Sequence, residues 1–121
     1  MAGSINVYLF AAAVLIILTA LVHSVMGERL IFARWRRKTP DIPNGYIGII
    51  WASWHVLSVF GLMIAAVVAF YAMGLISMSS ALLRAFATLF VVSSAFIAWG
   101  TKWQHPAWAV FLILAILMLI A

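Results

Sequence analysis

Four side chains able to bind metals or exchange protons stand out in this sequence: three histidines and its one glutamate. They are His23, His55, His105 and Glu28. Neutral imidazole binds Zn, Cu, Fe or Ni, and a carboxylate can complete the ligand set, so the four side chains together suffice for a transition-metal site. Imidazole and carboxylate groups at a membrane edge equally suit a proton-linked or quinone-linked site.

A b-type haem is another cofactor that this residue set suits. His23 and His55 can act as its axial ligands if they project from facing helices. Their positions place His55 about one helical turn deeper in the membrane than His23, which counts against a shared iron. The metal and haem hypotheses therefore both stay open, with the transition metal using all four residues.

Other chemistries lack their residues. The chain has no cysteine, which excludes disulfides, thiolate catalysis, cysteine zinc sites and iron–sulfur clusters. It has no phosphate-binding glycine loop, nucleophile elbow or aspartate-rich metal box. Ser24 directly follows His23, which sets the two side chains about 100° apart on a helix and disfavours a nucleophile–base pair. We predict no catalytic residue and favour a protein that is not an enzyme.

A purely structural role for the same polar side chains is the competing interpretation. Each would then form a local hydrogen bond or ion pair. The expected partners are Thr19 or a backbone carbonyl for His23, Ser58 for His55, loop carbonyls for His105, and Arg29 or Lys102 for Glu28.

The composition indicates what must position these residues. Of 121 residues, 69% are hydrophobic and 7% are charged, whereas a soluble domain carries about 25% charged residues. So few charges cannot cover a surface that faces water, so lipid must surround most of the chain. The net charge of +5 does not indicate nucleic acid, because most of it lies in one segment.

We predict an all-α fold, a single domain over residues 1–121 built as a bundle of four transmembrane helices. A span needs roughly 20 apolar residues, and four apolar runs are present. The predicted spans cover about 6–26, 47–71, 81–99 and 107–121. Ser79 or Ser80 can cap the third helix.

The distribution of basic residues predicts the orientation. Five of the seven Lys and Arg residues lie between the first two predicted spans, and Lys102 lies between the last two. Cytoplasmic loops are enriched in Lys and Arg, so both loops should be cytoplasmic and both termini periplasmic. All three histidines and Glu28 then gather at the cytoplasmic end.

Lipid is the first partner that the sequence predicts. The residues expected to contact anionic headgroups are Arg34, Arg36, Arg37 and Lys38. Six tryptophans near predicted membrane boundaries suit an interfacial belt; they are Trp35, Trp51, Trp54, Trp99, Trp103 and Trp108.

Small residues recur at helical spacing and predict where helices pack. The stripes are Ala13, Ala20 and Gly27; Gly61, Ala65 and Ala69; and Ser94 with Ala98.

Three short motifs resemble a group of small bacterial four-helix membrane proteins that have no assigned function. The motifs run from His23 to Glu28 (His-Ser-x-x-Gly-Glu), from Trp54 to Ser58 (Trp-His-x-x-Ser) and from His105 to Trp108 (His-Pro-x-Trp). The resemblance implies a multi-pass protein of the bacterial inner membrane and points to the same histidines. It implies no activity.

The function expected from the sequence is a non-enzymatic accessory or structural protein of the inner membrane. The alternatives are a protein that binds a metal or haem b through its histidines, and a proton-linked or quinone-linked subunit. The expected partners are anionic lipids, together with further copies of the chain or a larger membrane complex, and no nucleic acid.

Overall fold

The computed structural model describes residues 5–121, and within this range the chain is all α-helical. The elements are α1 (Val7–Met26), the π-helical turn η1 (Gly27–Phe32), α2 (Ala33–Arg37), α3 (Asn44–Ala72), α4 (Ser80–Gly100) and α5 (Ala107–Ile120). Three helical stretches are long and apolar enough to cross a membrane: Val7–Arg37, Gly45–Ala72 and Ser80–Gly100. Helix α5 is equally apolar but shorter, with 14 residues. The predicted all-α membrane fold is confirmed at this level.

The first helix is longer than the sequence predicted. Its predicted end was near Met26, but α1, η1 and α2 form one continuous helical stretch of 31 residues. The helical segment after Gly27 contains four arginines together with Glu28, Leu30 and Ala33, and all of these residue types are good helix formers. The helix ends only where Lys38 takes an extended conformation, two residues before Pro40. The basic segment is therefore mostly helical rather than a loop.

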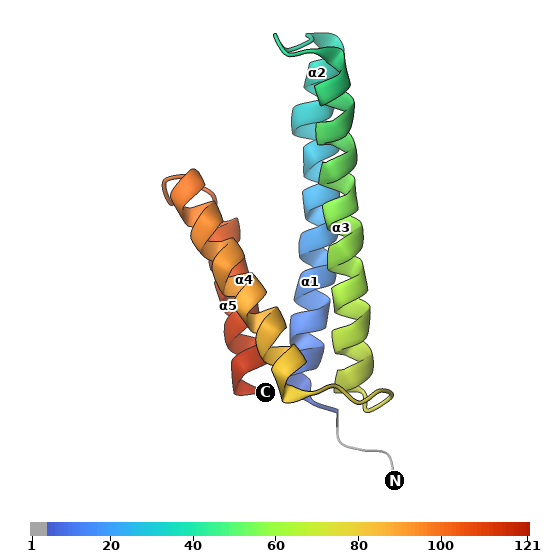
Figure 1. Ribbon diagram of the computed structural model, residues 1–121, viewed down its shortest axis with the longest axis vertical. Coiled ribbons are helices and arrows are strands. Elements are labelled where there is room, and N and C mark those ends of the chain that lie inside the picture. The colour runs from blue at the N-terminus through green and yellow to red at the C-terminus, as the bar shows by residue number, and fades with distance from the viewer. Residues whose placement is uncertain (1–4) are drawn as a thin grey trace.

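The helices form two hairpins that meet at one end and diverge at the other (Figure 1). Helix α1 packs along α3, α4 packs along α5, and α5 contacts α1 where the hairpins meet. At this shared end Asn6 donates from its backbone N–H to the Ala72 carbonyl at 3.0 Å and from Nδ2 to the Ala121 carbonyl at 3.3 Å. The opposite end of the α1–α3 hairpin is formed by α2 and residues 38–43, and we call it the arginine-rich end.

The main apolar core lies where the hairpins meet. It includes Leu9, Ala12, Ala13, Ile16, Ala65, Val68, Phe90, Leu114 and Met118. The predicted small-residue seam of α1 and α3 is confirmed, because a Cβ built on Gly61 would lie 3.3 Å from the Ala20 Cβ. Helix α4 buries Ser94, whose hydroxyl donates to the Trp108 carbonyl at 2.7 Å. Ser79 caps α4, as predicted, by accepting from the Leu82 N–H at 3.2 Å.

The outward faces of the helices are apolar. Large hydrophobic side chains such as Leu57, Phe60 and Phe96 are each more than half exposed. Large exposed apolar areas are rare on soluble monomers, whereas lipid solvates them. The exposed faces thus agree with helices that cross a bilayer.

Candidate functional site

Two serine–histidine hydrogen bonds join α1 and α3 in opposite directions. Ser24 Oγ on α1 lies 2.6 Å from Nδ1 of His55 on α3. One turn away, Nδ1 of His23 on α1 lies 3.0 Å from Oγ of Ser58 on α3. Both pairs lie across the seam of the hairpin, and Ser58 is buried. The seam therefore holds two imidazoles whose Nδ1 atoms are each fixed by the neighbouring helix.

Glu28 extends one of these pairs toward the arginine-rich end. Its Oε2 lies 3.4 Å from His55 Nε2 and accepts from Trp51 Nε1–H at 3.1 Å, while Oε1 accepts from Arg36 Nη2–H at 2.5 Å. The two N–H donors and the guanidinium charge stabilise the carboxylate form. The contacts form a chain from Glu28 through His55 to Ser24, and we call these three residues the polar relay.

The π-helical turn explains how Arg36 reaches Glu28. In a regular α-helix, residues eight positions apart point about 80° apart, because each residue turns the helix by about 100°. Turn η1 carries a wider hydrogen bond, from the Ala33 N–H to the Glu28 carbonyl. A π turn accommodates roughly one extra residue. Glu28 and Arg36 are therefore oriented like residues seven apart in a regular α-helix, and their side chains point only about 20° apart. The ion pair between Glu28 and Arg36 thus depends on this irregular turn.

Trp54 fixes the position of His23. The two rings stack with centroids 4.2 Å apart and planes 7° apart, and Trp54 Nε1–H donates to the His23 carbonyl at 2.9 Å. Gly27 makes room for the indole, because a Cβ at this position would overlap Trp54. Glycine is therefore required here for close approach of the two helices.

His105 does not join the other two histidines. It lies in the connection between α4 and α5, at the tip of the hairpin that diverges from α1 and α3 (Figure 1). Its Nδ1 accepts from the Ala107 N–H at 3.2 Å, at the start of α5. Within residues 5–121 no three His, Cys, Asp or Glu side chains form a group that could hold a metal ion. The predicted four-residue metal site is not assembled, because the hairpins separate toward this end.

The geometry of His23 and His55 also differs from the haem hypothesis. Ser58 lies opposite His23 and follows His55 by three residues, so His55 is about one turn nearer the arginine-rich end than His23. The sequence had predicted the opposite, with His55 deeper in the membrane. His23 is covered on one ring face by Trp54, and His55 Nε2 faces Glu28. Two axial imidazoles would instead have to direct one nitrogen each at a common iron.

The partners expected under the structural interpretation are also different. Thr19 donates its hydroxyl hydrogen bond to the Leu15 carbonyl at 2.7 Å, and His23 bonds to Ser58 instead of Thr19. His55 bonds Ser24 rather than Ser58, and Glu28 pairs with Arg36 rather than Arg29 or Lys102. Both histidines bond to a serine of the neighbouring helix instead of a partner on their own helix.

Sequence reasoning missed Ser24, Trp51 and Trp54 as site residues. Ser24 and Glu28 are four residues apart, as are Trp51 and His55, so each pair shares one helix face. These spacings were available in the sequence, but they become informative only once α1 and α3 are known to face each other.

The relay favours proton transfer over nucleophilic catalysis. Its order of hydroxyl, imidazole and carboxylate matches that of a nucleophile, base and orienting acid. Acyl transfer also requires N–H donors for the oxyanion, but Ser24 lies inside α1, where neighbouring backbone N–H groups bond within the helix. The arrangement supports hydrogen-bonded proton exchange more directly.

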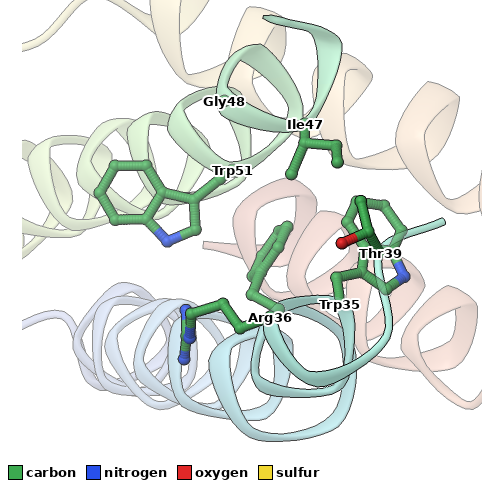
Figure 2. A pocket seen from close by; sticks show the side chains of 7 residues that line it. Trp35, Arg36, Thr39, Ile47, Gly48 and Trp51 are labelled. Atoms are coloured by element: carbon green, nitrogen blue, oxygen red, sulfur yellow. The ribbon is translucent and has the colours of Figure 1, made fainter. Parts of the chain in front are cut away.

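A groove of about 340 Å³ lies next to the relay at the arginine-rich end (Figure 2). Its lining residues are Phe32, Trp35, Arg36, Thr39, Ile47, Gly48 and Trp51. Arg36 and Trp51 line this groove and also contact Glu28. A molecule in the groove would therefore touch the partners of the relay carboxylate.

No protein-family model, curated protein sequence or solved structure matches this chain.

Proposed function

We propose that this chain is a non-enzymatic, multi-pass protein of the bacterial cytoplasmic membrane that takes up and releases protons through the polar relay. It spans the bilayer four times, with both termini periplasmic and the arginine-rich end cytoplasmic. The observation that carries the proposal is the chain of contacts from Glu28 through His55 to Ser24. The placement of Asn6 beside Ala121 supports termini on one side.

Exposure and chemistry define a direction along the relay. The Glu28 side chain is 38% exposed and the His55 side chain 26% exposed, so protons from water reach the carboxylate first. Imidazole can accept a proton on one nitrogen and release one from the other. Ser24 then receives or donates a hydrogen bond inside the seam.

The relay is confined to one end of the hairpin. Beyond Ser24 and the His23–Ser58 pair, the seam between α1 and α3 is apolar and closely packed, with Ala20 against Gly61 and Ile16 and Ala65 buried. Such a site suits a subunit that exchanges protons with a bound molecule or a partner chain at one membrane surface. The partner can be a further copy of this chain or a larger complex.

Coupled titration tests the proton function. We expect infrared difference spectra, recorded over a pH series in lipid, to show the Glu28 carboxyl band and imidazole bands changing together, because interacting groups titrate as a unit. Glu28→Gln assigns the carboxyl band, and His55→Gln should change its midpoint, whereas His105→Gln should not. Independent titration of the carboxyl and imidazole bands in the unmodified protein would contradict the relay.

Single cysteines test the membrane arrangement, because the chain contains no native cysteine. Lys38→Cys and Gln104→Cys should react with a membrane-impermeant maleimide only after the bacterial inner membrane is opened. Ser77→Cys, between α3 and α4, should react in intact spheroplasts. Labelling of positions 38 and 104 on opposite sides would refute the four-span arrangement.

A further inference from the structure

We infer that the groove beside Glu28 binds the phosphate of an acidic phospholipid, and that this phosphate competes with Glu28 for Arg36. Binding of the lipid requires only the groove. The effect of this binding on proton uptake by the polar relay rests on the proposed function. The inference specifies the ligand of the site, and it assigns a distinct role to one arginine among several.

The walls of the groove match an amphiphile with a charged head. Trp35 and Thr39 face Ile47 and Trp51 across the opening, and Arg36 lies at one side (Figure 2). Aromatic rings of this kind settle at the level of lipid headgroups. Gly48 leaves open space, since no atom lies within 4 Å of a Cβ built there. The groove thus offers an apolar path for an acyl chain beside a guanidinium.

The charge around the groove favours an anion. The same segment carries Arg34, Arg37 and Lys38 as exposed basic residues, and such juxtamembrane clusters attract acidic lipids. Asp41 is the one acidic residue in the connection between α2 and α3. A neutral lipid would gain nothing from this excess of positive charge, which is why we commit to an acidic one.

Arg36 can be shared between Glu28 and a phosphate. A guanidinium presents five N–H donors in a planar fork that matches phosphate geometry, and Arg36 is 60% exposed. In the structure the ion pair with Glu28 is made through Nη2. A phosphate that takes this donor would leave Glu28 with Trp51 and His55 as its hydrogen-bond partners.

The test uses the full chain in phosphatidylcholine bicelles, with 5-fluorotryptophan as the probe. Trp35→Phe and Trp51→Phe assign the two resonances from the groove. We expect phosphatidylglycerol, added in steps, to shift both resonances saturably, and equal phosphatidylcholine to leave them unchanged. Inorganic phosphate should produce no such shift, because it lacks the acyl chain that the groove accommodates.

Matched variants separate the groove from general surface charge. Arg36→Gln should weaken phosphatidylglycerol binding about tenfold, the loss expected for one charge-assisted contact, whereas Arg37→Gln should change it less than about twofold. Gly48→Leu should block the groove, and Gly45→Leu, on the same helix, should not. Circular dichroism establishes that all four variants remain helical.

Several outcomes would overturn the inference. Equal weakening by Arg36→Gln and Arg37→Gln would mean unspecific attraction to the membrane surface. Equal shifts with inorganic phosphate would identify a free anion site rather than a lipid site. If the coupled titration is observed but phosphatidylglycerol shifts neither fluorotryptophan resonance, only the assignment of the ligand is refuted. If the lipid shifts both resonances but the titration is not coupled, the proton function is refuted.

Discussion

At the scale of residues, the site consists of polar side chains that find their partners across the helix pair. The bonds from Ser24 to His55 and from His23 to Ser58 run in opposite directions. Buried polar groups in lipid need such partners, because no water is available to replace them. Each serine therefore both ties the helices together and fixes one imidazole nitrogen.

Removing the Ser24 hydroxyl should weaken the hairpin modestly. We expect Ser24→Ala to lower the free energy of unfolding by about 0.5–1.5 kcal/mol, as for side-chain hydrogen bonds within membranes. Ser53→Ala, at an exposed position of α3, is the control and should stay within about 0.5 kcal/mol of the unmodified protein. Unfolding in mixed micelles measures both. Equal effects from the two variants would argue against the bond.

Gly27 sets the distance between α1 and α3 at Trp54. We expect Gly27→Ala to destabilise the protein by about 1–3 kcal/mol, because the new methyl group forces the indole to move. The Trp54 indole N–H should then exchange faster with deuterium, which NMR detects. Gly48→Ala is the matched control: it enters open space in α3 and should be neutral or stabilising by up to about 1 kcal/mol.

At the scale of elements, η1 combines two functions. It continues the first helix into the basic segment, and it rotates Arg36 onto the face that carries Glu28. Single π turns inside α-helices are frequently found at functional sites. Helix α3 provides the opposite wall with Trp51, His55 and Ser58 on neighbouring turns.

Lengthening η1 by one residue should separate Arg36 from Glu28. An alanine inserted after Leu30, which is exposed, should rotate α2 by about 100° relative to Glu28. The Trp51 indole N–H resonance, which reports its bond to Glu28, should shift, and the response to phosphatidylglycerol should fall to the level of Arg36→Gln. Deletion of Leu30 is the matched control: it should convert the π turn into a regular α-turn, leave Arg36 seven residues from Glu28 on nearly the same face, and preserve both signals; loss of both signals in the deletion variant would contradict this role of η1.

At the scale of the whole molecule, the two hairpins diverge. Within residues 5–121 they contact each other only near their shared end (Figure 1). The core lies there, and the arginine-rich end stands apart from the tip of the α4–α5 hairpin. This separation keeps His105 away from the relay. It also restricts the site to one hairpin, in which α1, η1 and α3 supply every side chain of the relay.

Cysteine pairs test the divergence of the hairpins. Ala20→Cys combined with Gly61→Cys should crosslink readily within the chain, because the two positions face each other at van der Waals distance. His55→Cys combined with His105→Cys should not crosslink under the same oxidation in dilute nanodiscs. Efficient bridging of positions 55 and 105 would show that the hairpins pack side by side along their length.

The sequence by itself determined that the chain is all-α and apolar enough for a membrane. Charge content and apolar run length decide this, because few charges cannot cover a surface facing water. The helices α3, α4 and α5 begin and end within three residues of their predicted positions, since prolines, glycines and a capping serine limit them locally. The small-residue seam was also predictable, because helical spacing alone places Ala20 and Gly61 each on the face of its helix that carries the other small residues.

Only the tertiary structure decided which polar groups meet. The π turn is invisible to a count of 3.6 residues per turn, so the Glu28–Arg36 pair was not predicted. The predicted grouping of all three histidines assumed that residues on the same side of the membrane lie close together. Divergent helices can end on the same side and still lie far apart. Partner choice for His23 and His55 depends on the rotation and register of α1 against α3, which is set by contacts such as Gly27 with Trp54 and not by the spacing within either helix.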